Sequence, residues 1–149
     1  MACGKGECAM RRWIAGLVML AAAALMFVPS VSFTEDQDTV QLARAIYALC
    51  KTESYETKLA IGTVVMNRVE NPWFADNLGG VLSEQQQFPA GSRSDSDSLR
   101  AAHAVLSGAR SLPASALYYQ AADASLSWGA ENRIERIGGY NFYSESGNI

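Results

Sequence analysis

The chain is poor in cysteine and histidine, and this scarcity excludes several kinds of site. Three cysteines occur in 149 residues, and two of them, Cys3 and Cys8, precede a long apolar run, which leaves Cys50 alone in the rest of the chain. A single cysteine cannot form an internal disulfide, so the stability of the domain must come from packing. The one histidine, His103, would need mainly carboxylates beside it to hold zinc, and the sequence has no ligand spacing of that kind. We therefore expect neither a metal nor an organic cofactor.

Positive charge is also scarce beyond the first 32 residues. From Phe33 onward, nine lysines and arginines face fourteen aspartates and glutamates, which gives a net charge of −5. A protein that follows nucleic-acid phosphates needs a basic surface. We therefore expect no nucleic-acid partner.

An apolar run near the start of the chain predicts an export signal or an anchor. Arg11 and Arg12 precede residues 13–28, which carry no charge, and the sequence PSVS follows. This order is typical of a secretory signal. The sixteen residues are short for a membrane span, but extension to Phe33 gives twenty-one, so an uncleaved anchor is the alternative. We expect residues 1–33 to be this signal or membrane anchor and residues 34–149 to form one exported domain.

Two apolar helices around a short polar turn form the clearest pattern in the chain. Apolar side chains recur at helical spacing from Val40 to Cys50. Ser54 can cap a second helix, whose apolar residues lie between Lys58 and Val69 and which Pro72 stops. The turn between the helices carries Glu53, a carboxylate beside an apolar core, and we expect chemistry there first.

Further helices are predicted in the middle of the chain. Leu78, Val81 and Leu82 indicate a short helix, which two glycines weaken. Residues 90–98 are rich in glycine, serine and aspartate and predict the most exposed loop of the domain. A third helix is expected over residues 99–108, with a glycine near its end.

The last part of the chain changes from helix to strand composition. Before it, Trp73 and Phe74 lie in a proline-containing turn, and we expect them to close an edge of the core. Residues 116–119 and 140–143 are rich in aromatic residues and predict two strands. Helices followed by a short terminal β element indicate one mainly helical α+β domain.

Residues 42–69 read LARAIYALCKTESYETKLAIGTVVMNRV. This segment resembles one in the spore cortex-lytic (SleB-like) family of cell wall hydrolases, which reads roughly LARxVYAEARGEPYEGKVAVAAVVLNRV. Further on, the QF at 87–88 resembles the family's QF, residues 116–119 its strand before the last loop, and residues 137–143 its terminal IGxHxFY. The likeness covers nearly all of residues 40–143 and keeps the family's order.

The resemblance implies a lysozyme-like domain whose partner is peptidoglycan and which cuts the glycan strand between muramic acid and glucosamine. The most similar enzymes are lytic transglycosylases. In these, one glutamate donates a proton to the leaving oxygen, and the muramic acid's own 6-hydroxyl attacks in place of water. A carboxylic acid stays protonated near neutral pH when apolar surroundings penalise its charged form. Such an enzyme works without the second carboxylate of hydrolytic glycosidases.

Two positions depart from the family's pattern. The family's YAEARGE becomes YALCKTE at residues 47–53, so its first glutamate, the acid that the resemblance implies, is Leu49 here. Tyr140 stands where the terminal motif has histidine. The catalytic candidate is then Glu53, which follows Leu49 by four residues and would share its face if the helix continued. In the alternative interpretation, Glu53 is a structural carboxylate that binds turn amides or Arg68.

Substrate contacts are expected from residues that border loops. Gln87, Tyr119 and Trp128 are the candidates for lining a glycan groove, the two aromatic residues as platforms for sugar rings. The alternative places the aromatic residues in the core or at its rim. Asn67 and Arg68 would anchor the loop that carries Gln87, or would satisfy backbone groups.

A thiol-protease dyad is a further chemical alternative. A nucleophilic cysteine needs a nearby base, and Cys50 and His103 would have to supply both. No local signature joins the two residues. The position of Cys50 on an apolar stripe is instead typical of a small core residue.

Two functions from different classes follow from these patterns. The first is an exported peptidoglycan-remodelling enzyme, a lytic transglycosylase or muramidase-like hydrolase with Glu53 as its acid. The second is a catalytically inactive relative that binds peptidoglycan or a partner hydrolase, which Leu49 favours. A position of Glu53 in a cleft near Gln87 and Tyr119 would favour the enzyme, and a position on the outer surface the binder.

Overall fold

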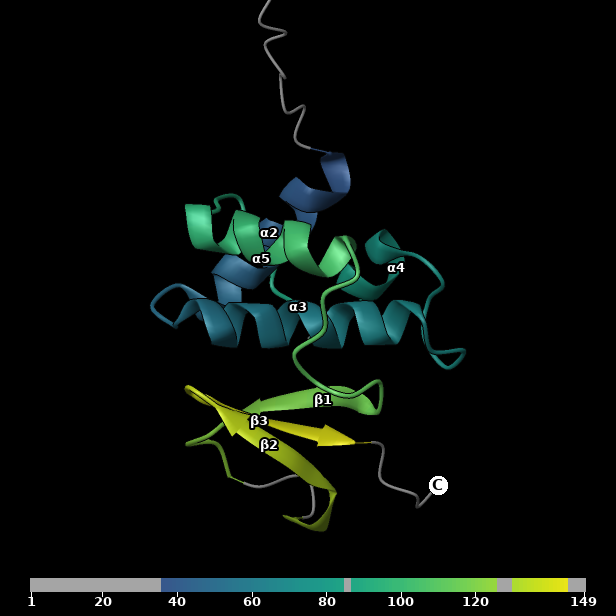
Figure 1. Ribbon diagram of the computed structural model, residues 1–149, viewed down its shortest axis with the longest axis vertical. Helices are drawn as coiled ribbons and strands as arrows, with labels where there is room; N and C mark the ends of the chain where they lie inside the picture. The colour runs from purple at the N-terminus through teal and green to yellow at the C-terminus, as the bar shows by residue number, and fades with distance from the viewer. Residues whose placement is uncertain (1–35, 85–86, 126–129, 145–149) are drawn as a thin grey trace, which may run out of the picture. The chain divides into compact units, whose positions relative to one another are not determined.

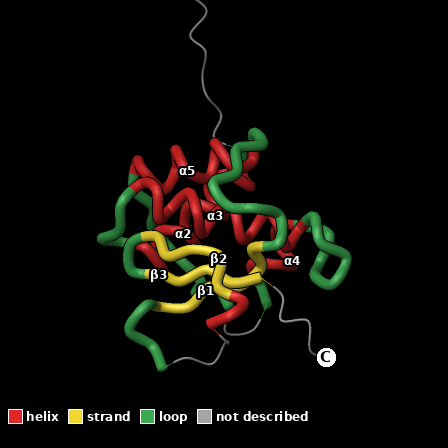
Figure 2. The backbone as a smooth tube through the Cα atoms, turned by 60° about the horizontal axis from the view of Figure 1, so that its bottom comes forward, coloured by secondary structure: helices red, strands yellow, loops and turns green. Residues whose placement is uncertain are grey.

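The structure, a computed structural model, describes residues 36–84, 87–125 and 130–144. Within these ranges, four helices come first and a small antiparallel sheet follows, as Figures 1 and 2 show. The elements are α2 (Gln37–Cys50), α3 (Tyr55–Val69), α4 (Leu78–Leu82), α5 (Ser96–Leu106), β1 (Ala116–Ala121), the 3-10 turn η1 (Ala130–Asn132), β2 (Arg133–Ile137) and β3 (Tyr140–Ser144). The predicted mainly helical α+β fold is confirmed.

Helix α3 lies at the centre of the domain, between the other helices and the sheet (Figure 1). Ser54 caps it by accepting a hydrogen bond from the Thr57 amide, as the sequence predicts, and it ends at Val69, before Pro72. A Cβ added at Gly62 would lie 3.2 Å from both Ile46 on α2 and Val105 on α5. The glycine therefore lets both helices pack closely on α3.

The sheet has the strand order β1-β3-β2, with both pairs antiparallel. Tyr119 pairs with Phe142, which is fully buried in the core, and Ala121 pairs with Tyr140. The sequence predicts β1 and β3 but not β2, because RIERI alternates charged and apolar residues without an aromatic or apolar run. The charged side chains suit an edge strand, which is the place of β2.

The loop predicted over residues 90–98 is shorter than expected. Helix α5 begins at Ser96, because the Asp95 carboxylate accepts a hydrogen bond from the Ser98 amide at 2.7 Å and caps the helix. The prediction that Trp73 closes an edge of the core is wrong, since its side chain is 74% exposed. Its neighbour Phe74 is half-buried and packs edge-to-face on Tyr118.

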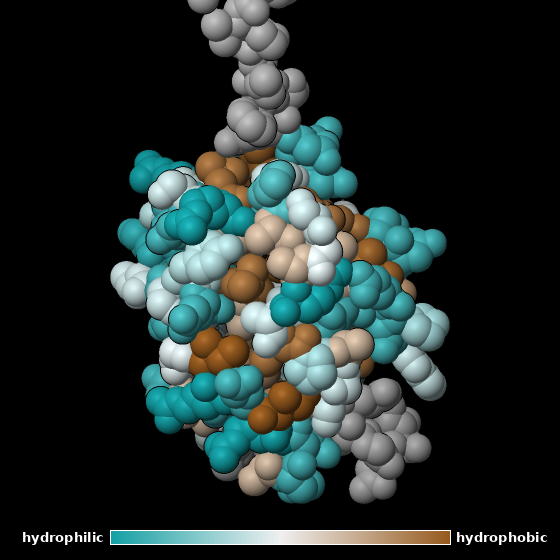
Figure 3. Space-filling view, in the orientation of Figure 1, coloured by the Kyte–Doolittle hydropathy of each residue, from teal (hydrophilic) through white to brown (hydrophobic). Residues whose placement is uncertain are grey.

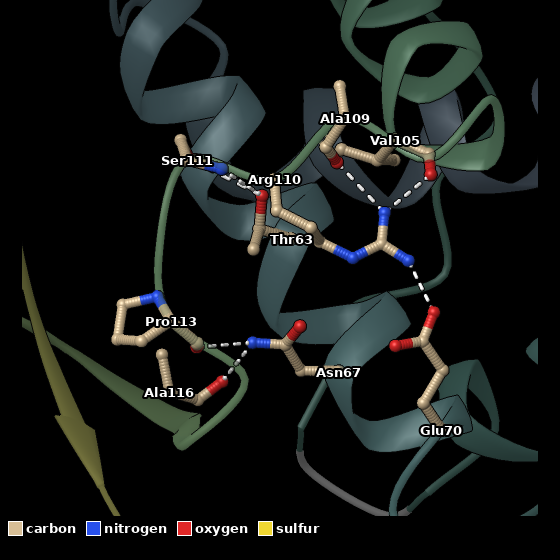
Figure 4. A network of polar contacts seen from close by, with 9 residues as sticks. All are labelled: Thr63, Asn67, Glu70, Val105, Ala109, Arg110, Ser111, Pro113 and Ala116. Carbon is tan, nitrogen blue, oxygen red and sulfur yellow. Dashed lines mark hydrogen bonds and ion pairs between the residues drawn. The ribbon is translucent and has the colours of Figure 1, made fainter.

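Polar side chains of α3 fix the path of the chain from α5 to β1, as Figure 4 shows. The Asn67 side chain donates hydrogen bonds to the carbonyls of Pro113 and Ala116, at 2.8 and 3.1 Å. Thr63 accepts a hydrogen bond from the Ser111 amide at 3.2 Å. These bonds satisfy backbone groups, as expected for Asn67, and set the point at which β1 starts.

The exposed surface mixes polar and apolar residues. On the face in Figure 3, hydrophobic side chains appear as a broken band among hydrophilic ones.

Within the described ranges, no helix is long and apolar enough to cross a membrane. The apolar run predicted to be a signal or an anchor lies outside these ranges.

An ion pair with one buried partner joins α3 to the N-terminus of α5. Lys58 Nζ lies 2.6 Å from the Asp95 carboxylate, and the Lys58 side chain is 3% exposed. Burial opposes ionisation of Asp95, but hydrogen bonds from Lys58 and Ser98 outweigh burial and lower the pKa of this carboxyl to about 2. A carboxyl with a lowered pKa stabilises the fold above its unfolded-state pKa, and this stabilisation is lost as the pH falls toward its folded pKa.

We therefore expect the free energy of unfolding to fall between about pH 4 and pH 2, in part through Asp95. In Asp95→Asn the fall across this window should be smaller, and the protein should be less stable at pH 7 because Lys58 loses its partner. Urea denaturation followed by circular dichroism at several pH values measures both effects. The control is Asp97→Asn, whose partner Arg100 is 67% exposed, and which should keep the wild-type dependence. An unchanged fall in Asp95→Asn would contradict the assignment.

Candidate functional site

The turn between α2 and α3 positions Glu53. The helix α2 ends at Cys50, whose carbonyl accepts a hydrogen bond from the Glu53 amide at 3.1 Å. Glu53 therefore does not extend the face of α2 that carries Leu49, as it would if the helix continued. Its side chain is half-buried and projects toward the turn between β2 and β3.

Among the described residues, two groups donate hydrogen bonds to the Glu53 carboxylate. The Gly139 amide lies 3.2 Å and the Thr57 hydroxyl 3.4 Å from Oε2. The predicted contact of Glu53 with a turn amide is thus confirmed. The predicted contact with Arg68 is wrong, because Arg68 pairs with Glu84 instead.

Two glycines in the β2–β3 turn make room for this carboxylate. A Cβ added at Gly138 would lie 2.4 Å from Glu53 Oε2 and 2.3 Å from the Thr57 hydroxyl, and Gly138 also has a φ of +55°. A Cβ added at Gly139 would lie 2.7 Å from Glu53 Oε1. The carboxylate can therefore lie against the β2–β3 turn because neither position carries a side chain.

Gly139→Ala should move the Glu53 carboxylate with little effect on the fold. The added methyl group meets the end of a flexible side chain, so the change in the free energy of unfolding should stay below about 1 kcal/mol. If Glu53 acts in catalysis, its displacement should lower kcat at least about tenfold. Gly108→Ala is the matched control, because its Cβ would meet no atom within 4 Å, although φ there is +100°. That variant should lose some stability and keep its kcat, and equal kcat values in both variants would contradict the prediction.

Glu53 faces an open cleft of about 420 Å³ at the end of the sheet. The volume is in the range of small-ligand sites. Opposite charges line it, since Asp123 follows β1 and Arg136 lies on β2. The full set of lining residues is Glu53, Ala121, Ala122, Asp123, Arg136, Gly139 and Tyr140. No sequence pattern marks Asp123 or Arg136 as site residues. The pair Gly138-Gly139, which begins two residues after Arg136, is the available signal of a tight turn near a site.

Tyr140 joins this cleft to the end of α2. Its hydroxyl donates a hydrogen bond to the Leu49 carbonyl at 2.9 Å. Burial, together with Cys50 and Glu53, raises the pKa of Tyr140 to about 12, so its hydroxyl stays neutral at physiological pH. The two positions that depart from the family pattern, Leu49 and Tyr140, are therefore in direct contact.

Tyr119 and Gln87 lie next to this cleft but do not line it. The Tyr119 ring packs edge-to-face on Tyr140 with centroids 5.9 Å apart, and its hydroxyl donates a hydrogen bond to the Gln87 carbonyl. Burial raises the pKa of Tyr119. Trp128, the third expected substrate contact, lies outside the described residues.

Arg68 anchors the loop that carries Gln87, as the sequence predicts. Its guanidinium donates hydrogen bonds to the Gln87 side chain at 3.0 Å, to Glu84 at 3.2 Å and to the Leu117 carbonyl at 2.7 Å. Burial lowers the pKa of Arg68, and Glu84 opposes this effect. The side chain of Gln87 is therefore engaged in holding the loop.

Cys50 lacks the features of a nucleophile. Its side chain is fully buried, and burial together with Glu53 raises the pKa of the thiol to about 12, whereas reactive cysteines have lowered values. His103 is exposed on α5. Within the described part of the chain, no three histidine, cysteine or carboxylate side chains are grouped to hold a metal ion.

A mainly helical domain with carboxylates in an open cleft beside a small sheet has the layout of a lysozyme-like protein. Residues 52–143 match the cell wall hydrolase family, and the chain belongs to this family. It is 34% identical over 115 residues to the spore cortex-lytic enzyme of Bacillus subtilis and 29% identical over 114 residues to that of Halalkalibacterium halodurans. These matches cover 72% of this chain but only 37% and 34% of the relatives, so the chain spans about a third of their length.

Solved structures of the same family share the fold. The catalytic domain of the Bacillus cereus SleB protein superposes with a TM-score of 0.64 at 25% identity, covering 73% of this chain and 91% of that domain. The catalytic domain of a germination-specific lytic transglycosylase, SleB from Bacillus anthracis, gives the same TM-score and identity, covering 78% and 100%. The predicted lysozyme-like, SleB-like fold is confirmed.

Proposed function

We propose that this protein is an exported enzyme that cleaves the glycan strand of peptidoglycan, with Glu53 as its acid. The observation that carries the proposal is the position of Glu53, held by the Gly139 amide and the Thr57 hydroxyl at the wall of an open cleft in a cell wall hydrolase domain. Family membership supports peptidoglycan as the substrate. The enzyme would act outside the cytoplasm, where peptidoglycan lies.

The reaction needs one proton donor beside the glycosidic oxygen. Protonated Glu53 gives its proton to the oxygen that leaves with glucosamine as the C–O bond to muramic acid breaks. The 6-hydroxyl of the same muramic acid then forms the new bond to C1, and its proton passes to the Glu53 carboxylate, which restores the acid. This transglycosylase sequence requires no second carboxylate.

A muramidase-type hydrolysis is the alternative chemistry for the same cleft. Asp123 lines the wall with Glu53 and supplies the second carboxylate that activates water in hydrolytic glycosidases. The products differ, because transglycosylation leaves anhydro-muramic ends and hydrolysis leaves reducing ends.

Substrate contacts would extend from this cleft toward the loop at Gln87. Tyr119 packs on Tyr140 and donates a hydrogen bond to the Gln87 carbonyl. It would therefore hold this loop beside the cleft, where the loop would contact the glycan. Trp128 would contribute a ring platform from the segment between β1 and β2. Gln87 would act mainly by positioning, since Arg68 holds its side chain.

A second candidate function is peptidoglycan binding without catalysis. It is favoured by Leu49 at the position of the family's first glutamate, and by the engagement of Glu53 with the sheet turn. In this case the carboxylate would fix the β2–β3 turn to the helices, and the cleft would bind glycan or a partner hydrolase.

Mass spectrometry of fragments released from purified peptidoglycan by the full chain separates these functions. The proposal expects soluble fragments with anhydro-muramic ends. Fragments with reducing ends would show that the enzyme hydrolyses the glycan and is not a transglycosylase. No fragments from vegetative or cortex peptidoglycan, with a folded chain that still sediments with the polymer, would overturn the enzymatic proposal and leave the binder.

A further inference from the structure

A second hollow lies along α2, on the N-terminal side of the Glu53 cleft. Its volume is about 310 Å³. An adjoining hollow of about 450 Å³ shares two of its residues, Gln41 and Arg44, and continues along α2 to Gln37. Together they form one groove, here called the α2 groove. Its main lining residues are Gln41, Arg44 and Ala45 on α2, Leu82 on α4, and Pro89 and Gly91 in the loop that follows.

The backbone of the walls is set by glycines. A Cβ added at Gly91 would lie 2.1 Å from the Arg44 carbonyl oxygen, so the loop backbone touches α2 and only glycine fits there. At Gly79, on the opposite wall, the nearest atoms to an added Cβ are those of Asn77 at 3.7 Å and Gln41 at 3.9 Å. The first glycine fixes one wall, and the second leaves space in front of Gln41. The groove is thus formed before any ligand binds.

The lining combines the positive charge of Arg44, the amides of Gln37 and Gln41, the hydroxyl of Ser83 and apolar walls. Arg44 is exposed and, like Arg93, Arg133 and Arg136, makes no ion pair with any described residue. Of these four arginines, Arg44 is the one that lines the α2 groove. A guanidinium binds a carboxylate through two parallel hydrogen bonds. The amide of Gln41 can both donate and accept. This set of groups suits an extended chain that carries a carboxylate and peptide groups.

The α2 groove and the Glu53 cleft are linked through α2 and β3. Gln41, Ala45 and Leu49 follow each other at intervals of four residues, so they share one face of α2. The Leu49 carbonyl accepts the hydrogen bond from Tyr140, which lines the cleft. From Arg44 to the end of α2 the helix rises about 9 Å. A peptide of four residues spans up to about 14 Å, which exceeds the length of this stretch of helix.

We propose that the α2 groove binds the stem peptide of peptidoglycan, with Arg44 on one of its carboxylates and Gln41 on its peptide groups. This inference rests on the proposed function, because it takes the glycan in the Glu53 cleft as the point where the peptide is attached. The groove then selects glycan that carries peptides.

Isothermal titration of the full chain with a synthetic stem tetrapeptide, L-Ala–γ-D-Glu–L-Lys–D-Ala, tests the binding itself. The wild type should bind this peptide, and Arg44→Gln should weaken binding about tenfold or more, the effect of losing a charge-assisted pair. Amidation of the peptide's carboxylates should weaken binding to the same degree. Arg133→Gln removes an exposed arginine of β2 that lines neither the α2 groove nor the Glu53 cleft, and it should leave the affinity unchanged. Absent binding, or equal binding by Arg44→Gln, would overturn the proposal.

Cleavage kinetics separate this proposal from the function on which it rests. On peptide-bearing glycan, Arg44→Gln should raise KM with kcat unchanged, and on glycan stripped of its peptides by an amidase it should match the wild type. Equal KM values on both substrates, for both proteins, would overturn the groove proposal and leave the enzymatic function standing. Peptide binding without cleavage of either substrate would instead overturn the enzymatic function and support the groove as the recognition surface of a binding protein.

Discussion

Glu53→Gln should reduce the rate of fragment release from peptidoglycan by at least about a hundredfold, the contribution of a positioned general acid. The amide cannot donate the proton that the leaving oxygen needs. It can still accept the hydrogen bond from Gly139, so the turn and the cleft should keep their shape. The measurement is the initial rate of soluble fragment release, quantified by mass spectrometry, with circular dichroism to confirm the fold.

Glu56→Gln is the matched control for this prediction. Glu56 lies in the first turn of α3, only three residues further on, and it is exposed. The two variants lose the same charge, so a difference between them reports the position of the carboxylate. Release by Glu53→Gln at the rate of Glu56→Gln would exclude Glu53 as the acid.

Arg68→Met should have the largest effect on stability, a loss of about 3–5 kcal/mol in the free energy of unfolding. Arg68 is 1% exposed, and its guanidinium lies 5.0 Å from the ring centre of Phe74 and 5.3 Å from that of Phe88. Methionine preserves much of the apolar packing but leaves the Leu117 carbonyl and the Glu84 carboxylate without their donor. Chemical denaturation at pH 7 measures the loss.

Arg100→Met is the control for the burial of the charge. The ion pair of Arg100 with Asp97 is exposed on α5, so this variant should change the free energy of unfolding by no more than about 0.5 kcal/mol. Similar losses in the two variants would show that the network around Arg68 does not stabilise the fold.

The helical half of the fold is predictable because its signals are local. Ser54 precedes an apolar run and caps it, and Pro72 follows the run, so α3 can be read within twenty residues. The strand β2 is missed because it forms through pairing with β3, which its own five residues do not indicate. Its charged side chains fit the edge of the sheet but not a typical strand pattern. The early start of α5 is missed because its cap, Asp95, lies in a run of serine and aspartate that is typical of a loop.

The candidate site is only partly predictable from the sequence. Glu53 is conspicuous as a carboxylate between two apolar helices. Its partner Gly139 is 86 residues away in the chain, and no local pattern indicates that they meet. Arg136 and Asp123 reach the cleft through strand pairing, which periodicity alone does not specify.

The contact between Leu49 and Tyr140 changes the meaning of the two departures from the family pattern. In the sequence they are 91 residues apart and count as two separate losses of polar groups. In the structure they form one contact, in which a neutral tyrosine hydroxyl binds a backbone carbonyl. This contact therefore carries no charge, and Glu53 lines the same cleft as Tyr140.

A crystal structure of the full chain carrying Glu53→Gln, with a bound peptidoglycan oligosaccharide, tests the central claim most directly. The proposal predicts a glycan chain across the cleft between Gly139 and Asp123, with the glycosidic oxygen within hydrogen-bond distance of the residue 53 side chain, about 3 Å. A glycan bound elsewhere on the domain, with residue 53 still turned to the Gly139 amide and out of reach of every glycosidic oxygen, would contradict it.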